Sequence, residues 1–561
     1  MKSFFLNVTL LFVTVSLSAQ SSFLKRKMDD SYLIEKYEVL NGQFSDSMHF
    51  SNQPVTQKDA VQFLETYIET HPNITLREKN EIYHFIAKNG DWATNGNGSI
   101  ISKKPILKHF YNTQSDMIHV QKSNYTFVLN PIIEYQQMIE SSHTNQNLFI
   151  NTRGIEARGT IANRLGFYTM FTDNQERGPQ HFQNYVANNN AVPGMGYYKD
   201  FQVAKPGRAY DYINATGYVD AAVIKNAVNV SFGYDRFQIG DGYRSLFLSD
   251  FSAPYTFVKI NTRLWKLNFQ NLYMELLPQY TRGGDKLLNK KYATMHHLSI
   301  NATKWLNIGL FESVVFGRKN HFDFGYMNPV ILYRSIEQNN GSPDNAILGL
   351  NAKIHTGLKT MLYGQVVLDE FKFGEIKARN GWWANKWGVQ MGLKSADIFG
   401  LKNLFIQAEL NVVRPFTYSF RDSVADFTHY NQSLAHPYGA NYAEASLQIK
   451  YKPTERLYIT MHGFYNKQGR DTLGGKSFGG NPLKDYGFKN ANYGIKLFNG
   501  FISTVKYVNL NLAYEVRDNL YVDIGMNYRS EKGTRAPNPS FSSTQVYSGF
   551  RLNIARKQYD F

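Results

Sequence analysis

The sequence predicts an all-β transmembrane fold, an outer-membrane antiparallel β-barrel of about eighteen strands with a small N-terminal periplasmic α-helical element. Three observations predict it. The mean hydropathy is −0.41, which is too low for a bundle of membrane helices. Aromatic residues nevertheless make up 15 % of the chain, as suits a barrel with a polar lumen and aromatic girdles. Segments with a period of two then recur through most of the sequence.

Residues 1–19 are typical of a signal peptide. Lys2 supplies a positive charge, Phe4 to Leu17 form a mostly apolar stretch, and Ala19 ends a run rich in small residues. We therefore expect Sec-type export with cleavage between Ala19 and Gln20. An uncleaved membrane anchor is the alternative, but the apolar stretch is short for a bilayer span.

Cysteine content and charge narrow the classes of function. The 561 residues include no cysteine, which excludes a lipoprotein anchor, disulfides and thiol catalysis. The net charge of +16 would suit nucleic acid, but export removes that partner, and lysine and arginine are spread along the chain. We expect outer-membrane lipid, anionic lipopolysaccharide and cell-surface polysaccharide as partners, and no nucleic acid.

Residues 20–120 predict a periplasmic segment that contains a helical hairpin at about 54–90. Thr56 and Thr75 each precede an acidic residue by three positions, as at a helix N-terminus, and apolar residues then recur at helical spacing. Another helix is expected over 31–40. We interpret this segment as a structural plug or collar at the barrel mouth rather than a catalytic domain.

Residues 121–561 predict the barrel. Successive side chains of a strand point to opposite faces, and the segments 404–412, 442–451 and 519–529 each alternate between apolar and polar residues. A soluble sandwich would also alternate, but its strands are about five or six residues long, whereas these run to about nine to thirteen. In the clearest segment, Leu520, Val522, Ile524, Met526 and Tyr528 alternate with Tyr521, Asp523, Gly525, Asn527 and Arg529.

The connections between the predicted strands are alternately short and long. This alternation is typical of outer-membrane barrels, whose turns face the periplasm and whose loops face outside. Short turns are predicted at 162–165, 225–227, 264–266, 303–306, 356–359, 396–403, 452–456 and 515–519, and long polar loops at 174–208, 237–255, 278–292, 317–345, 413–439 and 467–502.

Two single positions carry further expectations. The chain ends at Phe561, and a terminal aromatic residue after an alternating strand predicts recognition by the barrel-assembly machinery. Glu312 falls on the predicted lipid face of its strand, which we interpret as a β-bulge or an error of register.

The sequence offers little support for catalysis. Ser477 lies in a G-x-S-x-G pattern, but a nucleophile elbow needs a strand before it and a helix after it, and this stretch belongs to a glycine-rich loop. His296 and His297 are adjacent on a predicted strand, so they face opposite sides and cannot share one ion. We predict no catalytic residue, no metal and no cofactor. A hydrolase with a Ser–His pair across neighbouring strands stays a third, disfavoured class of function.

The most unusual stretch covers residues 232–255, which follow a strand and are too apolar for a solvated loop. We expect this stretch to fold inward against the barrel wall. It either constricts the lumen as a purely structural element or contacts a ligand. In the second case Arg236 and Arg244 would meet acidic groups, and Tyr243 would stack on a sugar ring.

This stretch resembles the signature of Wzi-type capsule assembly outer-membrane proteins, in which an arginine, a glycine turn, L-x-L-S and an alanine–proline pair follow in this order. Ile239 stands where that family usually has tryptophan. The resemblance implies a barrel of about eighteen strands with a periplasmic helical element. The matching residues are Arg236, Gly240, Gly242, Tyr243, Ser245, Leu246, Leu248, Ser249, Ala253 and Pro254.

Within this broad family the chain looks most like the RemB-type gliding motility proteins, in its Ala-Gln signal junction and its strands rich in tyrosine and asparagine. This resemblance implies a role at the cell surface, gliding motility components as partners, and no enzymatic activity.

We therefore predict a non-enzymatic barrel that binds or anchors cell-surface polysaccharide in gliding motility or surface adhesion. Trp382 and Trp383, beside a loop at 370–381, join Tyr243 as candidate stacking platforms. A substrate-specific porin is the alternative, because charged lumen residues such as Glu409 and Lys450 fit it equally well.

Overall fold

The computed structural model describes residues 18–19, 21–93, 101–102, 106, 109–162, 164–201, 207–283, 286–330, 332–422, 424–471, 475–533 and 540–561. The predicted signal peptide lies outside the described residues apart from Ser18 and Ala19, so its cleavage stays a prediction.

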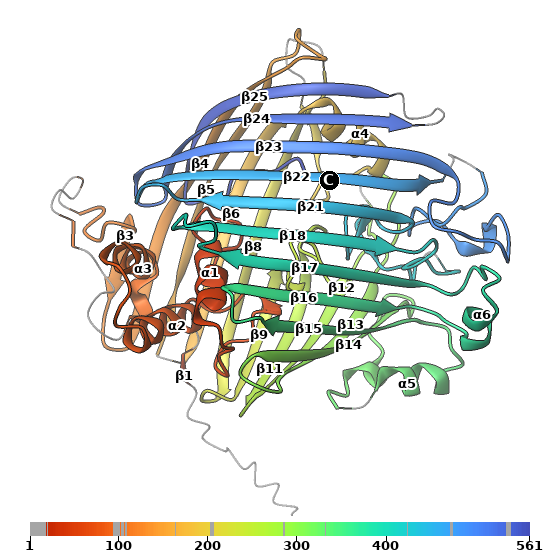
Figure 1. Ribbon diagram of the computed structural model, residues 1–561, viewed down its shortest axis with the longest axis horizontal. Helices are drawn as coiled ribbons and strands as arrows, with labels where there is room; N and C mark the ends of the chain where they lie inside the picture. The colour runs from red at the N-terminus through yellow and green to blue at the C-terminus, as the bar shows by residue number, and fades with distance from the viewer. Residues whose placement is uncertain are drawn as a thin grey trace, which may run out of the picture.

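Eighteen antiparallel strands form a closed barrel, as the alternation of the sequence predicts. The pairing of the first and last of them closes the ring, so the barrel wall has no free edge. Figure 1 shows the wall from the side, with its last strands in blue above the middle strands in green. The wall strands are, in ring order, β4 (Tyr125–Glu140), β5 (Leu148–Ile161), β6 (Leu165–Arg177), β8 (Ala209–Ile224), β9 (Val228–Asp235), β11 (Tyr255–Leu264), β12 (Leu267–Leu276), β13 (Lys291–Asn301), β14 (Leu306–Phe316), β15 (Asn345–His355), β16 (Thr360–Leu368), β17 (Trp387–Ala396), β18 (Leu404–Val413), β21 (Tyr442–Tyr451), β22 (Leu457–Arg470), β23 (Phe501–Arg517), β24 (Leu520–Gly533) and β25 (Phe541–Leu552).

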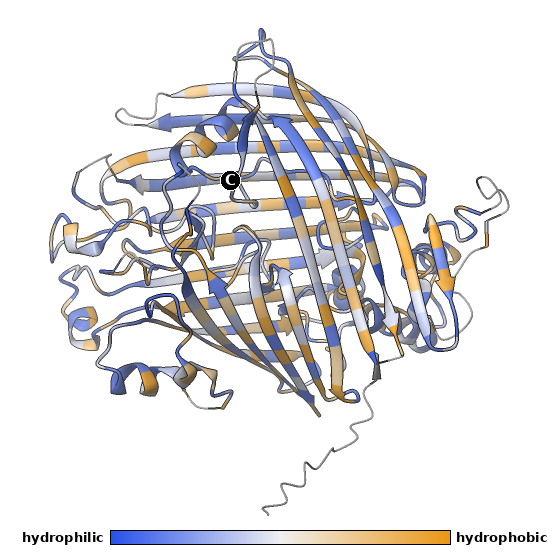
Figure 2. Cartoon of the chain, turned by 180° about the vertical axis from the view of Figure 1, so that it is seen from behind, coloured by the Kyte–Doolittle hydropathy of each residue, from blue (hydrophilic) through white to orange (hydrophobic). Residues whose placement is uncertain are grey.

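Each wall strand has an apolar outer face and a polar inner face. In β24, Val522 and Ile524 are exposed on the outside, whereas Asp523 and Asn527 are buried inside. Figure 2 shows the result as bands of opposite hydropathy along the strands. A bilayer can therefore cover the outside while the polar side chains bond to one another within.

The turns and loops lie at opposite ends of the barrel. The short turns fall where the sequence predicts them, for example between β8 and β9 and between β23 and β24. The long loops carry short helices and strand pairs of their own. These elements are α4 (Gln180–Asn189), β7 (Lys199–Phe201), β10 (Gln238–Ile239), η2 (Phe324–Met327), α5 (Tyr333–Asn339), α6 (Phe373–Ala378), β19 (Thr428–His429), β20 (Gln432–Ser433) and η3 (Tyr486–Phe488).

The N-terminal helices pack at the short-turn end, on the left in Figure 1. Lys36 Nζ lies 2.6 Å from Glu81 Oε2 and 2.8 Å from Asn403 Oδ1, and so joins two helices to a barrel turn. Thr75 and Glu78 cap the third helix reciprocally. None of the helices among the described residues is long and apolar enough to cross a membrane. The elements of this region are β1 (Ser18–Ala19), α1 (Tyr32–Asn41), β2 (Asn52–Gln53), α2 (Gln57–Thr70), α3 (Leu76–Lys88), η1 (Gly90–Trp92) and β3 (Ile118–Gln121).

The described chain has several segments inside the barrel wall. The β9–β11 connection runs inward, as the sequence predicts, and β10 within it pairs with β2 of the N-terminal segment. The β18–β21 connection packs on it, since the Ser249 N–H donates to Leu434 O at 2.8 Å. Residues 553–561, which follow β25, also lie within the wall.

Two expectations for single residues need correction. Phe561 does not end a wall strand, because β25 stops at Leu552 and the tail folds inward, where the Phe561 ring packs against His181 and Tyr185. This fold also explains why the alternation fails over Arg556 and Lys557. Glu312 does face outward, but neither a bulge nor a register error is involved, since the β13–β14 ladder is continuous.

Candidate functional site

The inward β9–β11 connection, residues 236–254, forms a constriction that crosses the lumen to the far wall. The Tyr243 N–H donates to Glu409 Oε2 at 2.9 Å, and Glu409 belongs to β18, nearly opposite β9 in the ring. The Leu246 N–H donates to Gln365 Oε1 of β16 at 3.0 Å. Polar side chains of the far wall therefore hold the backbone of the constriction.

Two glycines of the family-like motif allow this close approach. Gly240 has a φ of +134°, and a Cβ there would come within 2.2 Å of Gln365 Nε2. A Cβ on Gly242 would lie 2.5 Å from the Arg244 carbonyl oxygen and 2.6 Å from Glu409 Oε2. A Cβ at either position would force the turn or the facing side chains of the wall to shift.

The apolar part of the motif anchors the constriction in a core. Leu246, Phe247 and Leu248 are fully buried. The Phe247 ring stacks on Phe311 of β14 with 4.5 Å between centroids and 1° between planes. The Tyr418 hydroxyl donates to Leu246 O at 2.7 Å. These contacts account for the apolar character that distinguishes this stretch from a solvated loop.

Arg244 and Tyr243 bind the C-terminal tail. Arg244 Nη2 lies 2.8 Å from Asp560 Oδ1, and Arg244 Nη1 lies 3.5 Å from Asp250 Oδ1. The Tyr243 hydroxyl donates to Asp560 and Gln558. The structure thus gives acidic partners to Arg244 from within the chain itself. The ring neighbour of Tyr243 is also internal, because the His462 ring lies 4.6 Å away between centroids.

Lys27 and Arg26 of the N-terminal segment complete this charge cluster. Lys27 Nζ lies 3.0 Å from Asp250 Oδ2, and Arg26 Nη1 lies 3.3 Å from the same atom. Burial alone would raise the pKa of Asp250, but Arg26, Lys27 and Arg244 hold it well below its usual range. Burial lowers the pKa of Lys27 to about 8, although Asp250 opposes that shift. Asp250 therefore stays ionised at neutral pH, while the pKa of Lys27 lies at about 8.

A cavity of about 340 Å³ lies between the constriction, the N-terminal segment, the C-terminal tail and the wall from β4 to β9. This volume is within the range of small-molecule sites. Its lining carries more cationic than anionic side chains. The cationic residues are Lys25, Arg26, Lys27, Arg236, Arg244, Arg556 and Lys557, and the anionic residues are Glu134, Asp235, Asp250 and Asp560.

Arg236 differs from Arg244 in this cavity. Arg236 is half-buried, and its Nη1 donates to Gly194 O at 2.8 Å. We find no ion pair of Arg236 among the described residues. A guanidinium carries five N–H donors, so Arg236 can donate further hydrogen bonds to an anionic ligand. The Arg244 guanidinium, in contrast, already pairs with Asp560 of the C-terminal tail.

Trp382 and Trp383 lie elsewhere, on the long-loop connection between α6 and β17. Their rings make an edge contact at 6.3 Å, and Trp383 also packs against Tyr486 and Phe416. Neither tryptophan lines the cavity. The structure therefore divides the predicted binding residues between the lumen and the loop end of the barrel.

The sequence reasoning missed Lys27 and Asp560. Lys27 ends the basic run Lys25–Lys27 that follows the predicted cleavage site, and this run was a readable signal. No signal in the sequence marked Asp560. Its role depends on the inward fold of the C-terminal tail, and the sequence of that tail resembles the end of a strand.

The other candidate groups make contacts within the chain. The Ser477 Oγ accepts the Gly479 N–H at 3.2 Å, and no α-helix follows it in the described chain, where the next helical element is the short 3-10 helix η3. His297 faces the lumen, where its Nδ1 lies 2.7 Å from Asn52 Oδ1, and His296 faces outward. These positions agree with the opposite faces that the strand geometry predicts.

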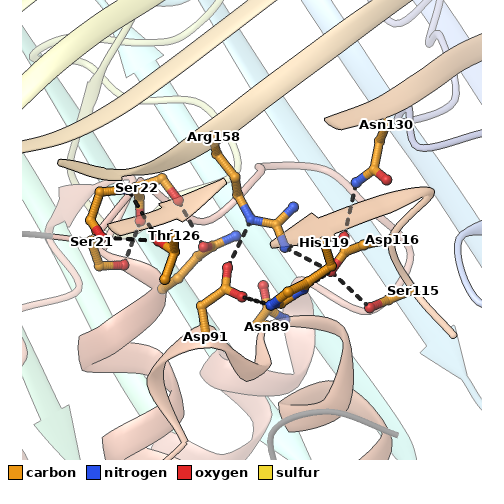
Figure 3. Close-up of polar contacts among 12 residues, drawn as sticks. Ser21, Ser22, Asn89, Asp91, Ser115, Asp116, His119, Thr126, Asn130 and Arg158 are labelled. Carbon is orange, nitrogen blue, oxygen red and sulfur yellow. Dashed lines mark hydrogen bonds and ion pairs between the residues drawn. The ribbon is translucent and has the colours of Figure 1, made fainter. Parts of the chain in front are cut away.

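Asp91, Asp116 and His119 lie close enough together to suggest a metal site. Figure 3 shows that Arg158 of β5 reaches both carboxylates, with Nε 3.2 Å from Asp91 and Nη2 3.2 Å from Asp116. Burial would raise the pKa of Asp116, but Arg158 and His119 hold it below its usual range. The Arg158 guanidinium pairs with both carboxylates, and these ion pairs link the N-terminal segment to the wall.

Comparison with known proteins supports the fold. No protein-family model and no curated protein matches the chain. Among solved structures, the chain is similar to Wzi, an outer-membrane protein involved in group 1 capsule assembly in Escherichia coli and described as a carbohydrate-binding β-barrel. The identity is 12 %, the TM-score is 0.54, and the match covers 96 % of this chain and 100 % of that one.

Two Pseudomonas aeruginosa outer-membrane proteins match less well. OprD has a TM-score of 0.40 at 12 % identity, and covers 76 % of this chain and 95 % of its own. OpdK, solved with vanillate, has a TM-score of 0.42 at 10 % identity, and covers 76 % and 98 %.

Proposed function

We propose that this barrel binds cell-surface polysaccharide through acidic sugar groups at the lumen cavity, and that it is not an enzyme. The observation that carries the proposal is the excess of cationic side chains around the 340 Å³ cavity, together with the available guanidinium of Arg236. Arginine binds carboxylate and phosphate groups through paired donors, and aromatic faces nearby suit sugar rings. Tyr168, Tyr212 and Tyr218 line the same cavity.

Two similarities to known proteins support this proposal. The motif from Arg236 to Pro254 resembles the Wzi-type signature, and the barrel has the fold of Wzi, which is described as binding carbohydrate. Retention of polysaccharide at the surface is the role we propose for this chain, in gliding motility or surface adhesion like that of the RemB-type proteins.

The proposed setting follows from the same barrel. Sec-type export would deliver the chain, and the barrel-assembly machinery would insert it into the outer membrane. Lipopolysaccharide would surround its outer face, and gliding motility components would be its protein partners.

Exchange of Arg236 for glutamine tests the binding role on cells. We expect the Arg236→Gln variant to reach normal surface levels but to retain less acidic polysaccharide, because it keeps a hydrogen-bonding side chain and loses the charge. Arg282→Gln is the matched control, since Arg282 is a loop arginine outside the cavity that pairs with Asp200 at 2.8 Å. Equal retention by the Arg236→Gln variant and the native protein, at equal surface levels, contradicts the proposal.

A substrate-specific porin is the alternative function. The segments inside the wall favour a binding protein, because a porin keeps an open water-filled lumen. Conductance across a planar bilayer separates the two functions. We expect little steady current, and a large steady current would favour the porin.

A further inference from the structure

The described residues of the β14–β15 connection, 317–330 and 332–344, fold over the outside of the barrel. Its helix α5 lies beside β14 at the lower right of Figure 1, outside the wall and toward the loop end. The inner face of β13 is marked by His297, which contacts the lumen residues Asn52 and Asn351. His296 and its ladder partner Glu312 therefore point outward, to the face where α5 lies.

Residues around the start of α5 cover this outward polar pair. The Tyr333 ring stacks on the His296 ring at 3.9 Å, and the Arg334 N–H donates to Glu312 Oε1 at 3.0 Å. His296 Nδ1 lies 3.7 Å from Glu312 Oε2. Glu312 is only 4 % exposed as a result, so the connection shields two polar side chains on the lipid-facing side of the wall.

A small apolar core fixes the connection to the wall. Tyr326 and Tyr333 pack with outward residues of β13 and β14, among them Val314 and Phe316. Arg318 then pairs with Asp344 at 2.6 Å, and so ties the two ends of the connection together. The connection is thus a folded part of the outer wall rather than a loop extended into water.

The same connection exposes large apolar side chains. We call four of these residues, Phe324, Met327, Val330 and Leu332, the outer-wall patch. It is continuous with the bare lipid face, because Leu310 and Leu350 are paired on the outer side of β14 and β15 and are 52 % and 47 % exposed. Glu312 lies two residues from Leu310 along the same face. The outer-wall patch consists of Phe324 (79 % exposed), Met327 (45 %), Val330 (85 %) and Leu332 (68 %).

We propose that the outer-wall patch inserts among the acyl chains of the leaflet on the loop side of the membrane. Four exposed apolar side chains on one folded segment are costly in water but favourable in lipid. The patch is continuous with the lipid face of the wall. This continuity identifies lipid acyl chains as the partner of the patch, and it places the patch at the depth of the neighbouring outer-face residues in the bilayer. The connection therefore serves as a lateral lipid anchor that also keeps the His296–Glu312 pair away from the acyl chains.

Spin labelling tests this proposal directly, because the chain has no native cysteine. Phe324→Cys and Val330→Cys variants would each be labelled with a nitroxide in the full-length protein, reconstituted into phospholipid vesicles. Ile524→Cys on the outer face of β24 is the lipid reference. Tyr493→Cys, on the β22–β23 loop and 53 % exposed like the patch residues, is the aqueous reference. A heat-modifiable mobility on gels verifies that each labelled barrel is folded.

We expect labels at positions 324 and 330 to collide readily with oxygen and poorly with a water-soluble nickel chelate, as at position 524. Labels at both positions that are as accessible to the nickel chelate as the label at position 493 would overturn the proposal. Lipid access at only one of the two positions would also contradict it, because the patch is proposed to insert as one surface.

Discussion

Arg244 Nη2 lies 2.8 Å from Asp560 Oδ1, and this contact joins the constriction to the penultimate residue of the chain across 316 positions of sequence. Both side chains are almost fully buried. The pair therefore holds two lumen segments together and forms one side of the proposed binding cavity.

Loss of one partner from this pair should destabilise the barrel. Removal of one member of a buried ion pair leaves an uncompensated charge, which costs about 3–5 kcal/mol. We expect Arg244→Gln to lower the free energy of unfolding by this order, as measured by urea titration of protein folded in vesicles. Arg282→Gln, at an exposed pair, should change it by about 1 kcal/mol or less. Equal changes in the free energy of unfolding for the two substitutions would show that the Arg244–Asp560 ion pair does not stabilise the barrel.

The docking of the C-terminal tail should resist mild acid. Burial would raise the pKa of Asp560, but Arg244, His462 and Lys27 hold it below its usual range. A carboxylate with a lowered pKa contributes stability that is present above its ordinary pKa of about 3.9 and is lost as the pH falls through the lowered value. Protection of the tail from carboxypeptidase should thus be unchanged between pH 7 and pH 5. Release of the tail within that range would contradict this assignment.

Affinity for an acidic saccharide should fall as the pH rises through about 8. The pKa of Lys27 is lowered to about 8 by burial, so the cavity loses one positive charge above that pH. Loss of a charge-assisted hydrogen bond should weaken binding about tenfold between pH 7 and pH 9. In Lys27→Arg the decline should disappear, because a guanidinium stays charged over this range. An equal decline in both proteins would exclude Lys27 as its source.

The Phe247 side chain should keep the constriction seated on the wall. Its ring fills the space beside Gly349, where a Cβ would come within 2.3 Å of the ring. Truncation of a buried phenylalanine costs about 3–5 kcal/mol, and here it would loosen the constriction. We expect Phe247→Ala to raise the conductance of single barrels in planar bilayers.

The exposed Phe324, which lies on the outside of the barrel, provides the control for this measurement. Phe324→Ala should leave the conductance unchanged. If Phe247→Ala also leaves it unchanged, the constriction does not depend on the ring stack.

The wall of the barrel was predictable from sequence because it follows a local rule. Alternate residues such as Ile524 and Asp523 face lipid and lumen, and the short turns follow from where the alternation restarts. The contacts inside the wall were not predictable in this way. Arg244 was expected to meet acidic groups of a ligand if the constriction contacts one. Its pairing with Asp560 and Asp250 of the chain itself depends on closure of the whole ring.

Residues that break the alternation of apolar and polar side chains mark places where another segment packs on the wall or where the wall ends. Glu312 broke the outward apolar pattern, and the structure shows that a connection folded over the wall supplies its partner. Arg556 and Lys557 broke the alternation because the last residues are a luminal tail. Trp382 and Trp383 have no periodic pattern to place them, and so their distance from the cavity could not be read from the sequence.

The most direct test of this account is a calorimetric titration of the purified, detergent-solubilised barrel. The ligands are a uronic-acid oligosaccharide and its carboxyl-reduced counterpart, in which each carboxylate is replaced by an uncharged hydroxymethyl group. We predict saturable binding of the acidic ligand, and affinity at least about tenfold lower for the reduced ligand and for the Arg236→Gln variant. Equal affinity for both ligands, or native affinity in the Arg236→Gln variant, would contradict recognition of acidic sugars at the lumen cavity.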